Sequence, residues 1–187
     1  METTPVLIAG AGPIGLVLAM DLASRGVEST VLELRHRGEP PSVKSNHVSS
    51  RSMEIFRRLG VASAVRAGGL PDDYPHDVAY RTSATGIELT RILIPSRLGR
   101  VRGDPGPDTA WPTAEPPHRI NQIFLEPILF AHAAAIPGIR LINRVEVTGF
   151  EQDDTGVTVA ARDLDSGALR QFRASYLIGC DGGRSGA

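Results

Sequence analysis

Three glycines near the start of the chain, followed by a glutamate, have the types and spacing of a dinucleotide-binding site. The glycines are Gly10, Gly12 and Gly15, and the glutamate is Glu33. In such a pattern the first glycine turns the chain, the second lets the backbone approach a pyrophosphate, and the third allows a helix to pack closely on a strand. Glu33 would accept hydrogen bonds from a ribose diol and would repel a 2′-phosphate. The pattern therefore favours the adenosine half of FAD or NAD over that of NADP.

The elements that must position these residues are a strand, a turn, a helix and a second strand. Val6 to Ala9 predict an apolar strand, Pro13 to about Ser24 predict an apolar helix, and Ser29 to Leu34 predict the second strand. A pyrophosphate would lie at the helix N-terminus, where free N–H groups and the helix dipole favour negative charge. An ordinary glycine-rich turn is the alternative, and the ordered succession of elements ending in an acid argues against it.

Composition bounds the class of protein. The chain has 187 residues, 41% of them hydrophobic and 22% charged, which predicts a globular protein of one to two domains. A net charge of −1 without a basic stripe, together with 5% aromatic residues, argues against a nucleic-acid partner and against an acidic membrane surface. The five histidines lack metal-ligand spacing, so no metal site is expected.

The expected location is the cytoplasm. The apolar stretches are too short to span a bilayer, and the first four residues lack the features of a signal peptide. The single cysteine, Cys180, cannot form an internal disulfide and fits a reducing compartment.

Further helices are expected from about Arg51 to Leu59, as a short turn within 62–69, and from near Leu125 or Glu126 onward. The last start would place Pro127 in a first helical turn, where proline is tolerated. A first strand, a three-stranded β-meander and a separate last strand should follow. The segments that predict these later strands are Ile139 to Asn143, Val145 to Gln152, Val157 to Arg162, Leu169 to Arg173, and Tyr176 to Cys180.

Residues 71–117 differ in composition, because they are rich in proline, glycine and isolated charges. We expect one or two strands, exposed loops and an irregular portion over 99–117. The overall prediction is an α/β fold: a Rossmann-like dinucleotide-binding domain with a mostly parallel sheet and a β-meander, plus a partial β-rich substrate layer. The domain would comprise 1–70 and 118–187, and 71–117 would belong to the substrate-binding layer.

Three stretches, in this order, resemble the FAD-dependent aromatic hydroxylases, the class A flavoprotein monooxygenases that include para-hydroxybenzoate hydroxylase and phenol hydroxylase. They are the glycine turn with Glu33, the pair of segments 51–60 and 119–126, and the segment 176–185, which contains an Asp-Gly motif. The resemblance extends over nearly the whole chain but covers only the N-terminal part of a typical member. The chain is therefore expected to be an N-terminal fragment. The resemblance implies that the Rossmann-like domain is an FAD-binding domain and that it is incomplete at its C-terminus.

The resemblance implies a set of cofactor contacts. Lys44 and Arg51 would contact the cofactor phosphates, with solvated surface charges as the alternative. Gln122 would hydrogen-bond the ribityl chain. Asp181 would lie beside the pyrophosphate, and an ordinary strand-end turn is the alternative. The full implied set is Gly10, Ala11, Gly12, Pro13, Ile14, Gly15, Glu33, Lys44, Arg51, Gln122, Asp181 and Gly182.

The implied activity is hydroxylation of a phenolic or polyketide-type aromatic substrate, with FAD as cofactor, NADPH or NADH as reductant and O₂ as oxygen source. No catalytic residue is assigned, since His76, Asp77 and His118 are all candidates for a substrate base. Alternatives are an FAD-dependent reductase or oxidase and a truncated, non-catalytic relative that depends on a partner. An NAD-dependent dehydrogenase is least favoured, because it leaves the Asp-Gly motif unexplained. The pattern assigns no oligomeric state.

Overall fold

The computed structural model describes residues 1–41, 45–107, 109 and 112–183. The chain divides into two compact units, one made of Met1–Ser42 with Leu125–Ala187 and the other of Val43–Phe124. None of the helices within the described ranges is long and apolar enough to cross a membrane.

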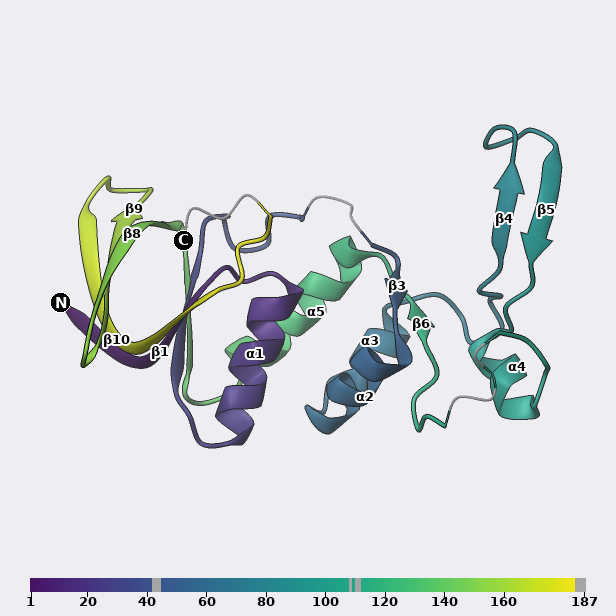
Figure 1. Cartoon of the computed structure of the whole chain (residues 1–187), viewed down its shortest axis with the longest axis horizontal. Helices are drawn as coiled ribbons and strands as arrows, with labels where there is room; N and C mark the ends of the chain where they lie inside the picture. The colour runs from purple at the N-terminus through teal and green to yellow at the C-terminus, as the bar shows by residue number, and fades with distance from the viewer. Residues whose placement is uncertain (42–44, 108, 110–111, 184–187) are drawn as a thin grey trace. The chain divides into compact units, whose positions relative to one another are not determined.

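The first unit is built on a six-stranded sheet with the order β7-β2-β1-β10-β9-β8. Figure 1 labels β1 and the strands β8, β9 and β10 of this sheet. Its first four strands are parallel to one another, and β10, β9 and β8 form an antiparallel meander. The prediction of a mostly parallel sheet with a β-meander is therefore confirmed. The strands are β1 (Glu2–Ala9), β2 (Ser29–Glu33), β7 (Ile139–Asn143), β8 (Val145–Asp153), β9 (Gly156–Asp163) and β10 (Leu169–Gly179).

Both faces of the central strands are covered. Helix α1 (Pro13–Ser24) packs against β1, β2 and β7 on one face. On the other face, side chains from β1 and β2 join those of the meander in an apolar cluster. All five residues of β2 are buried, which explains its continuous apolar sequence. The buried members of the cluster are Leu7, Leu32, Val145, Val157, Val159, Ala161, Phe172 and Ala174.

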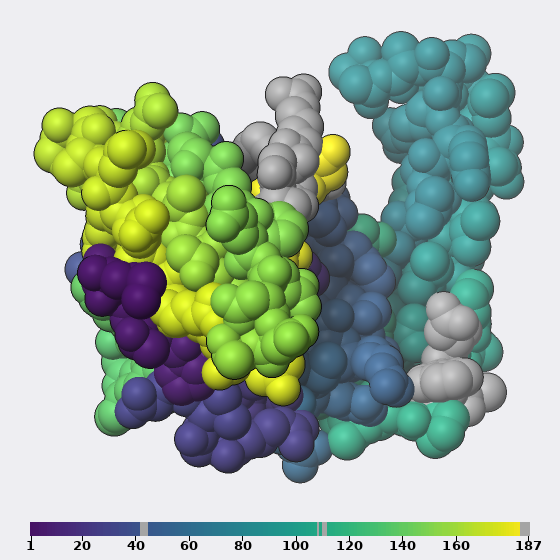
Figure 2. Space-filling model, turned by 60° about the vertical axis from the view of Figure 1, so that its left-hand side comes forward, coloured from purple at the N-terminus to yellow at the C-terminus, as the bar shows by residue number. Residues whose placement is uncertain are grey.

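Strand β10 corrects the prediction of two separate strands. It runs without interruption from Leu169 to Gly179. Its first part pairs antiparallel with β9, and its later part pairs parallel with β1. The two predicted segments join because the ladder with β1 continues across the gap between them, with Ala174 paired to Thr4 and Tyr176 paired to Val6. The outer surface of the meander is open to solvent, as Figure 2 shows in green to yellow.

Helix α5 (Gln122–Ala134) begins before the predicted start. The side-chain oxygen of Asn121 accepts a hydrogen bond from the Ile123 N–H at 3.1 Å, which caps the helix at this earlier point. Pro127 therefore lies inside the helix rather than in its first turn. The prediction of a start near Leu125 or Glu126 was wrong because it gave the proline more weight than the asparagine cap.

The second unit contains short elements. Helices α2 (Ser50–Arg58) and α3 (Ala62–Ala67) confirm the predicted helical segments. Strand β3 (His47–Val48) pairs with β6 (His118–Arg119), and β4 (Val78–Arg81) pairs with β5 (Glu88–Ile92), both antiparallel.

Helix α4 (Arg97–Arg102) was not predicted, since its sequence lies mostly within the segment expected to be irregular. The Ser96 hydroxyl accepts a hydrogen bond from the Gly99 N–H at 3.0 Å, which caps the start of the helix. Gly103, with φ of 87°, ends it in the left-handed region.

The β4–β5 hairpin has two unlike faces. Glu88 pairs with both Arg81 and Arg91 at 2.7 Å on one face. Val78 and Ile92 are paired in register, and the register shift between Tyr80 and Arg81 leaves them on the other face, where both are exposed. That 71–117 contributes a substrate-binding layer stays a prediction.

The apolar cluster should dominate the stability of the first unit. Phe172 is 1% exposed within it, so Phe172→Ala should lower the free energy of unfolding by about 3–5 kcal/mol. Urea unfolding measures the change. Leu169→Ala, on the same strand but at a side chain 78% exposed, is the control and should change stability by less than about 0.5 kcal/mol. Equal losses in the two variants would contradict the position of this core.

Candidate functional site

The turn between β1 and α1 lies at the carboxyl ends of the parallel strands. Gly10 has φ of 103°, and its N–H donates to the Leu32 carbonyl oxygen at 2.7 Å. A Cβ on Gly10 would lie 2.6 Å from the Cys180 carbonyl oxygen. The first glycine is therefore required both by its backbone angle and by the close approach of the chain after β10.

The other two glycines differ in what surrounds them. A Cβ on Gly15 would lie 2.0 Å from the Gly10 carbonyl oxygen, so close packing of the turn on α1 excludes a side chain. A Cβ on Gly12 would meet nothing within 4 Å. Packing within the protein thus accounts for glycine at position 15 but not at position 12.

The space over Gly12 lies at the N-terminus of α1. Gly12 is the N-cap residue and provides no side-chain hydrogen bond to the helix. Pro13 is the first helical residue, and Ile14 is 72% exposed. The N–H groups of the first helical turn therefore face open space and carry the positive end of the helix dipole. This arrangement fits an anionic group such as a pyrophosphate.

Glu33 ends β2 at the same edge of the sheet and is only 7% exposed. One of its carboxylate oxygens, Oε2, accepts a hydrogen bond from the Ala11 N–H at 2.7 Å. The other, Oε1, accepts from the Arg35 N–H at 3.0 Å and from Arg35 Nε at 2.9 Å. Burial raises the pKa of Glu33, but the bonds from Arg35 and Ala11 outweigh it and leave the pKa below its usual value. Glu33 is thus an ionised hydrogen-bond acceptor beside the glycine turn.

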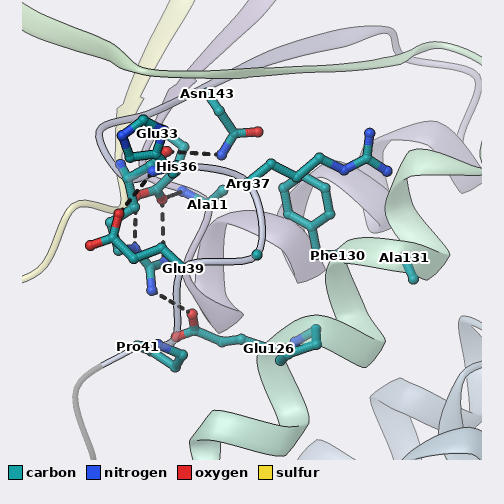
Figure 3. Close-up of a pocket in the computed structure, with 13 residues that line it drawn as sticks. Ala11, Glu33, His36, Arg37, Glu39, Pro41, Glu126, Phe130, Ala131 and Asn143 are labelled. Atoms are coloured by element: carbon teal, nitrogen blue, oxygen red, sulfur yellow. Dashed lines mark hydrogen bonds and ion pairs between the residues drawn. The ribbon is translucent and has the colours of Figure 1, made fainter. Parts of the chain in front are cut away.

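Arg35 also reaches a second carboxylate. Its Nη1 lies 3.0 Å from Oε2 of Glu126, which α5 carries and which is 6% exposed. In Figure 3 Glu126 points from α5 toward the loop after β2. The sequence analysis missed both residues. The available signal was a carboxylate in a helix segment that is otherwise largely apolar, since a buried acid of this kind needs a cationic partner.

A pocket of about 220 Å³ opens beside these groups. Its walls come from the loop after β2 and from α5 (Figure 3). Arg37 and Phe130 both line this pocket, and the Arg37 guanidinium lies over the Phe130 ring, 5.6 Å from its centre. The pocket therefore combines an ionised acceptor, Glu33, with an aromatic surface.

The predicted Asp-Gly motif follows β10 at the same edge of the sheet. Asp181 and Gly182 are exposed, and Gly182 has φ of 92°. The backbone nitrogen of Asp181 would lie 2.8 Å from a Cβ on Gly10. The structure thus brings the glycine turn, Glu33 and Asp181 together within the first unit.

The remaining predicted cofactor contacts belong to the second unit or lie outside the described residues. Arg51 is exposed in the first turn of α2. Gln122 begins α5, and its backbone N–H donates to the Ser45 carbonyl oxygen at 2.9 Å. Lys44 lies outside the described residues. The roles of these three residues stay predictions.

The three candidates for a substrate base have different surroundings. Asp77 accepts hydrogen bonds from the Ile94 N–H at 2.9 Å and from Arg91 at 3.1 Å. His118 is buried, with Nε2 3.2 Å from the Val65 carbonyl oxygen. Asp77 and His118 are therefore engaged in contacts within the second unit.

His76 is 5% exposed, and its Nδ1 has no hydrogen-bond partner within the described residues. Burial, together with nearby cations such as Arg119, lowers the pKa of His76 to about 4. The His47 ring lies edge-on to it, with the ring centres 6.2 Å apart. His76 is thus a neutral imidazole at neutral pH with one unused ring nitrogen. Within the described ranges, no cluster of three histidine, cysteine or acidic side chains could hold a metal ion.

Comparison with known proteins connects these features to one family. A family model described as "FAD binding domain" matches residues 3–187. Among curated proteins, 2,4-dichlorophenol 6-monooxygenase of Delftia acidovorans is 33% identical over 97% of this chain and 30% of its own length. Aklavinone 12-hydroxylase DnrF of Streptomyces peucetius subsp. caesius is 34% identical over 96% of this chain and 36% of its own length. The chain therefore spans about a third of the length of such relatives.

Comparison with solved structures finds similar flavin-containing proteins. The rebeccamycin biosynthetic enzyme RebC with reduced flavin is 37% identical, with a TM-score of 0.82 over 99% of this chain and 33% of that chain. The flavin-dependent monooxygenase PieE in complex with FAD and substrate is 32% identical, with a TM-score of 0.83 over 98% of this chain and 31% of that chain.

The contrast between the glycines can be tested by stability. Gly15→Ala forces a methyl group against a backbone carbonyl, so it should lower the free energy of unfolding by about 2 kcal/mol, within the range typical of overpacking. Gly12→Ala meets no atom and should cost at most about 1 kcal/mol through the less favourable N-cap residue. Chemical denaturation of both variants measures the difference. A loss at position 12 as large as that at position 15 would contradict the open space over Gly12.

The lowered pKa of His76 predicts a pH dependence. Between about pH 6.5, the ordinary value, and about pH 4, the unfolded chain binds a proton on this residue that the folded chain excludes. The contribution to stability is therefore complete above pH 6.5 and is lost as the pH falls toward 4. The slope of unfolding free energy against pH in this window should be smaller in His76→Leu than in the wild type. Parallel pH profiles would show that His76 does not titrate in this way.

Proposed function

The chain belongs to the FAD-binding domain family, and from that premise we propose that it forms the part of an FAD site that holds the adenosine diphosphate half of the cofactor. The complete protein would be an FAD-dependent aromatic monooxygenase. The single observation that carries the proposal is the open, positively polarised helix start over Gly12, with the ionised Glu33 at the end of the adjacent strand.

The residues of this chain divide the binding task by polarity. First-turn N–H groups of α1 donate toward the pyrophosphate, and the Gly12 backbone permits its approach. Glu33 accepts from the ribose diol. Strand β1 lies at a switch point of the sheet, because the chain places β2 on one side of it and β10 on the other. Ligands of open α/β sheets bind at such switch points. Donors for phosphate and an acceptor for ribose thus lie at one edge.

The chemistry that bound FAD supplies is electron transfer from NADH or NADPH to O₂, with one oxygen atom entering the aromatic ring and the other leaving as water. The relatives' names, which include a dichlorophenol monooxygenase and an aklavinone hydroxylase, support a phenolic or polyketide-type substrate for this protein. In this scheme 71–117 contributes to the substrate layer, and the neutral His76 offers a ring nitrogen for a hydrogen bond.

Three further contacts belong to the proposal. Lys44 and Arg51 would balance the charge of the cofactor phosphates, and Gln122 would hydrogen-bond the ribityl chain. A cytoplasmic location is proposed as well, because NADH and NADPH are the reductants that the scheme requires and the single cysteine, Cys180, fits a reducing compartment.

FAD retention tests the proposal directly. The purified chain, mixed with FAD and freed of excess ligand, should keep a visible flavin absorption band, with the released cofactor identified by chromatography. Gly12→Ser should weaken FAD binding by at least about tenfold, ~1.4 kcal/mol, because the side chain fills the open space and its oxygen competes for the helix N–H groups. Stability should be unchanged, since serine is a favoured N-cap residue.

Two results would oppose the proposal. Equal FAD affinity in the wild type and Gly12→Ser would show that the N-terminus of α1 does not bind the cofactor. Full-length protein that, with FAD and a nicotinamide, incorporates no labelled oxygen from O₂ into any phenol or polyketide quinone would remove the monooxygenase assignment.

A further inference from the structure

Arg35 lies between two buried carboxylates and contacts both. We propose that Arg35, held in place by Glu126, is a positioning residue that fixes the Glu33 carboxylate so that one defined oxygen, Oε2, meets the ribose of the cofactor. This inference rests on the proposed function and adds two residues and a preferred acceptor atom to it.

The two oxygens of Glu33 are unequally occupied. Oε1 accepts two good hydrogen bonds from Arg35, at 3.0 Å from the backbone N–H and at 2.9 Å from Nε. Oε2 accepts the Ala11 N–H at 2.7 Å and has only a long contact, 3.5 Å, with Arg35 Nη2. Because a carboxylate oxygen offers about two lone pairs, the remaining acceptor capacity lies on Oε2. A single ribose hydroxyl should therefore account for most of the contact with Glu33.

The position of Arg35 is determined by groups distant in the sequence. Its Nη1 pairs with Glu126 Oε2 at 3.0 Å, across 91 positions. The Asn143 side-chain N–H donates to the Arg35 carbonyl oxygen at 3.1 Å, which fixes its backbone from the end of β7. Helix α5 and β7 thus both anchor the residue that orients Glu33.

The charges explain why Glu126 matters. Glu33 and Glu126 are both nearly fully buried, and the single Arg35 guanidinium bonds to both. A planar guanidinium can present separate N–H groups to the two acids, whereas a lysine ammonium is a single point charge. When Glu126 is neutral, Arg35 loses the ion pair on its far side. The Glu33 carboxylate then keeps its backbone donors but loses the fixed side-chain donor that completes its orientation.

Adenosine diphosphate is the probe for the experiment, because the proposed contacts all belong to the first unit and to the adenosine half of the cofactor. Dissociation constants are measured for ADP, 2′-deoxy-ADP and 3′-deoxy-ADP with the wild type, Glu126→Gln and Arg35→Lys. Glu2→Gln is the matched control, since Glu2 also joins two arginines, Arg140 and Arg170, in the same unit.

In the wild type, loss of one of the two hydroxyls should weaken binding by about tenfold and loss of the other by much less, since a hydrogen bond to a charged group is lost in one case only. In Glu126→Gln and in Arg35→Lys the larger penalty should fall to about threefold or less. Glu2→Gln should keep the wild-type penalty. Thermal unfolding shows whether each variant is folded. Because two different variants are measured, the test does not fail if one of them does not fold.

The loss of affinity on removing one hydroxyl distinguishes a positioning role from a general structural role. A variant with only a structural defect would bind all three nucleotides more weakly by the same factor. An unchanged penalty in both variants overturns the inference, and so does a wild-type penalty that is absent or equal for the two hydroxyls.

FAD retention is measured in parallel. Retained FAD with an unchanged penalty leaves the proposed function standing and removes the inference. A penalty that falls in the variants of a chain that does not retain FAD supports the inference and removes only the retention of the whole cofactor by this chain. No binding of either ligand overturns both.

Discussion

The close approach of the turn after β1 to the chain after β10 is the constraint on which the rest of the first unit depends. Gly10 lies against the Cys180 carbonyl, and Gly15 lies against the carbonyl of Gly10, at distances that leave no room for a side chain at either glycine. These contacts allow α1 to start directly over the sheet edge. They also bring Asp181 beside the turn, so that a single steric condition assembles backbone donors and the Asp-Gly motif in one place.

Electrostatics then gives this edge two opposite polarities. The helix start over Gly12 offers N–H groups and a positive dipole end. Glu33, kept ionised by Arg35 and Ala11, offers a negative acceptor in a buried position. A buried carboxylate is costly unless it is paired, and here its partners also determine its orientation. The groups that make the acid tolerable are therefore the groups that prepare it for a ligand.

The β4–β5 hairpin of the second unit depends little on a buried core. Every residue of its two strands is exposed, and the ion pairs of the hairpin lie on the surface, where such pairs contribute little stability. An isolated two-stranded hairpin is marginally stable at best. His76, in the same unit, differs from the hairpin because it is buried with an unused ring nitrogen. A polar atom left without a partner in the interior is more costly than one at the surface and is more informative about function.

The sequence by itself determined the features that depend on local sterics and periodicity: the glycine turn, α1, β2 with its terminal Glu33, and the strands of the meander. Tertiary structure decided what depends on pairing between distant segments. Strand β10 is continuous because it has a partner on each side. Arg35 could not be identified from its neighbours, because its second partner, Glu126, lies 91 positions away on α5. Spacing along the chain records the nearest neighbours of a residue, whereas burial of a charge beside a distant partner is decided only when the chain folds.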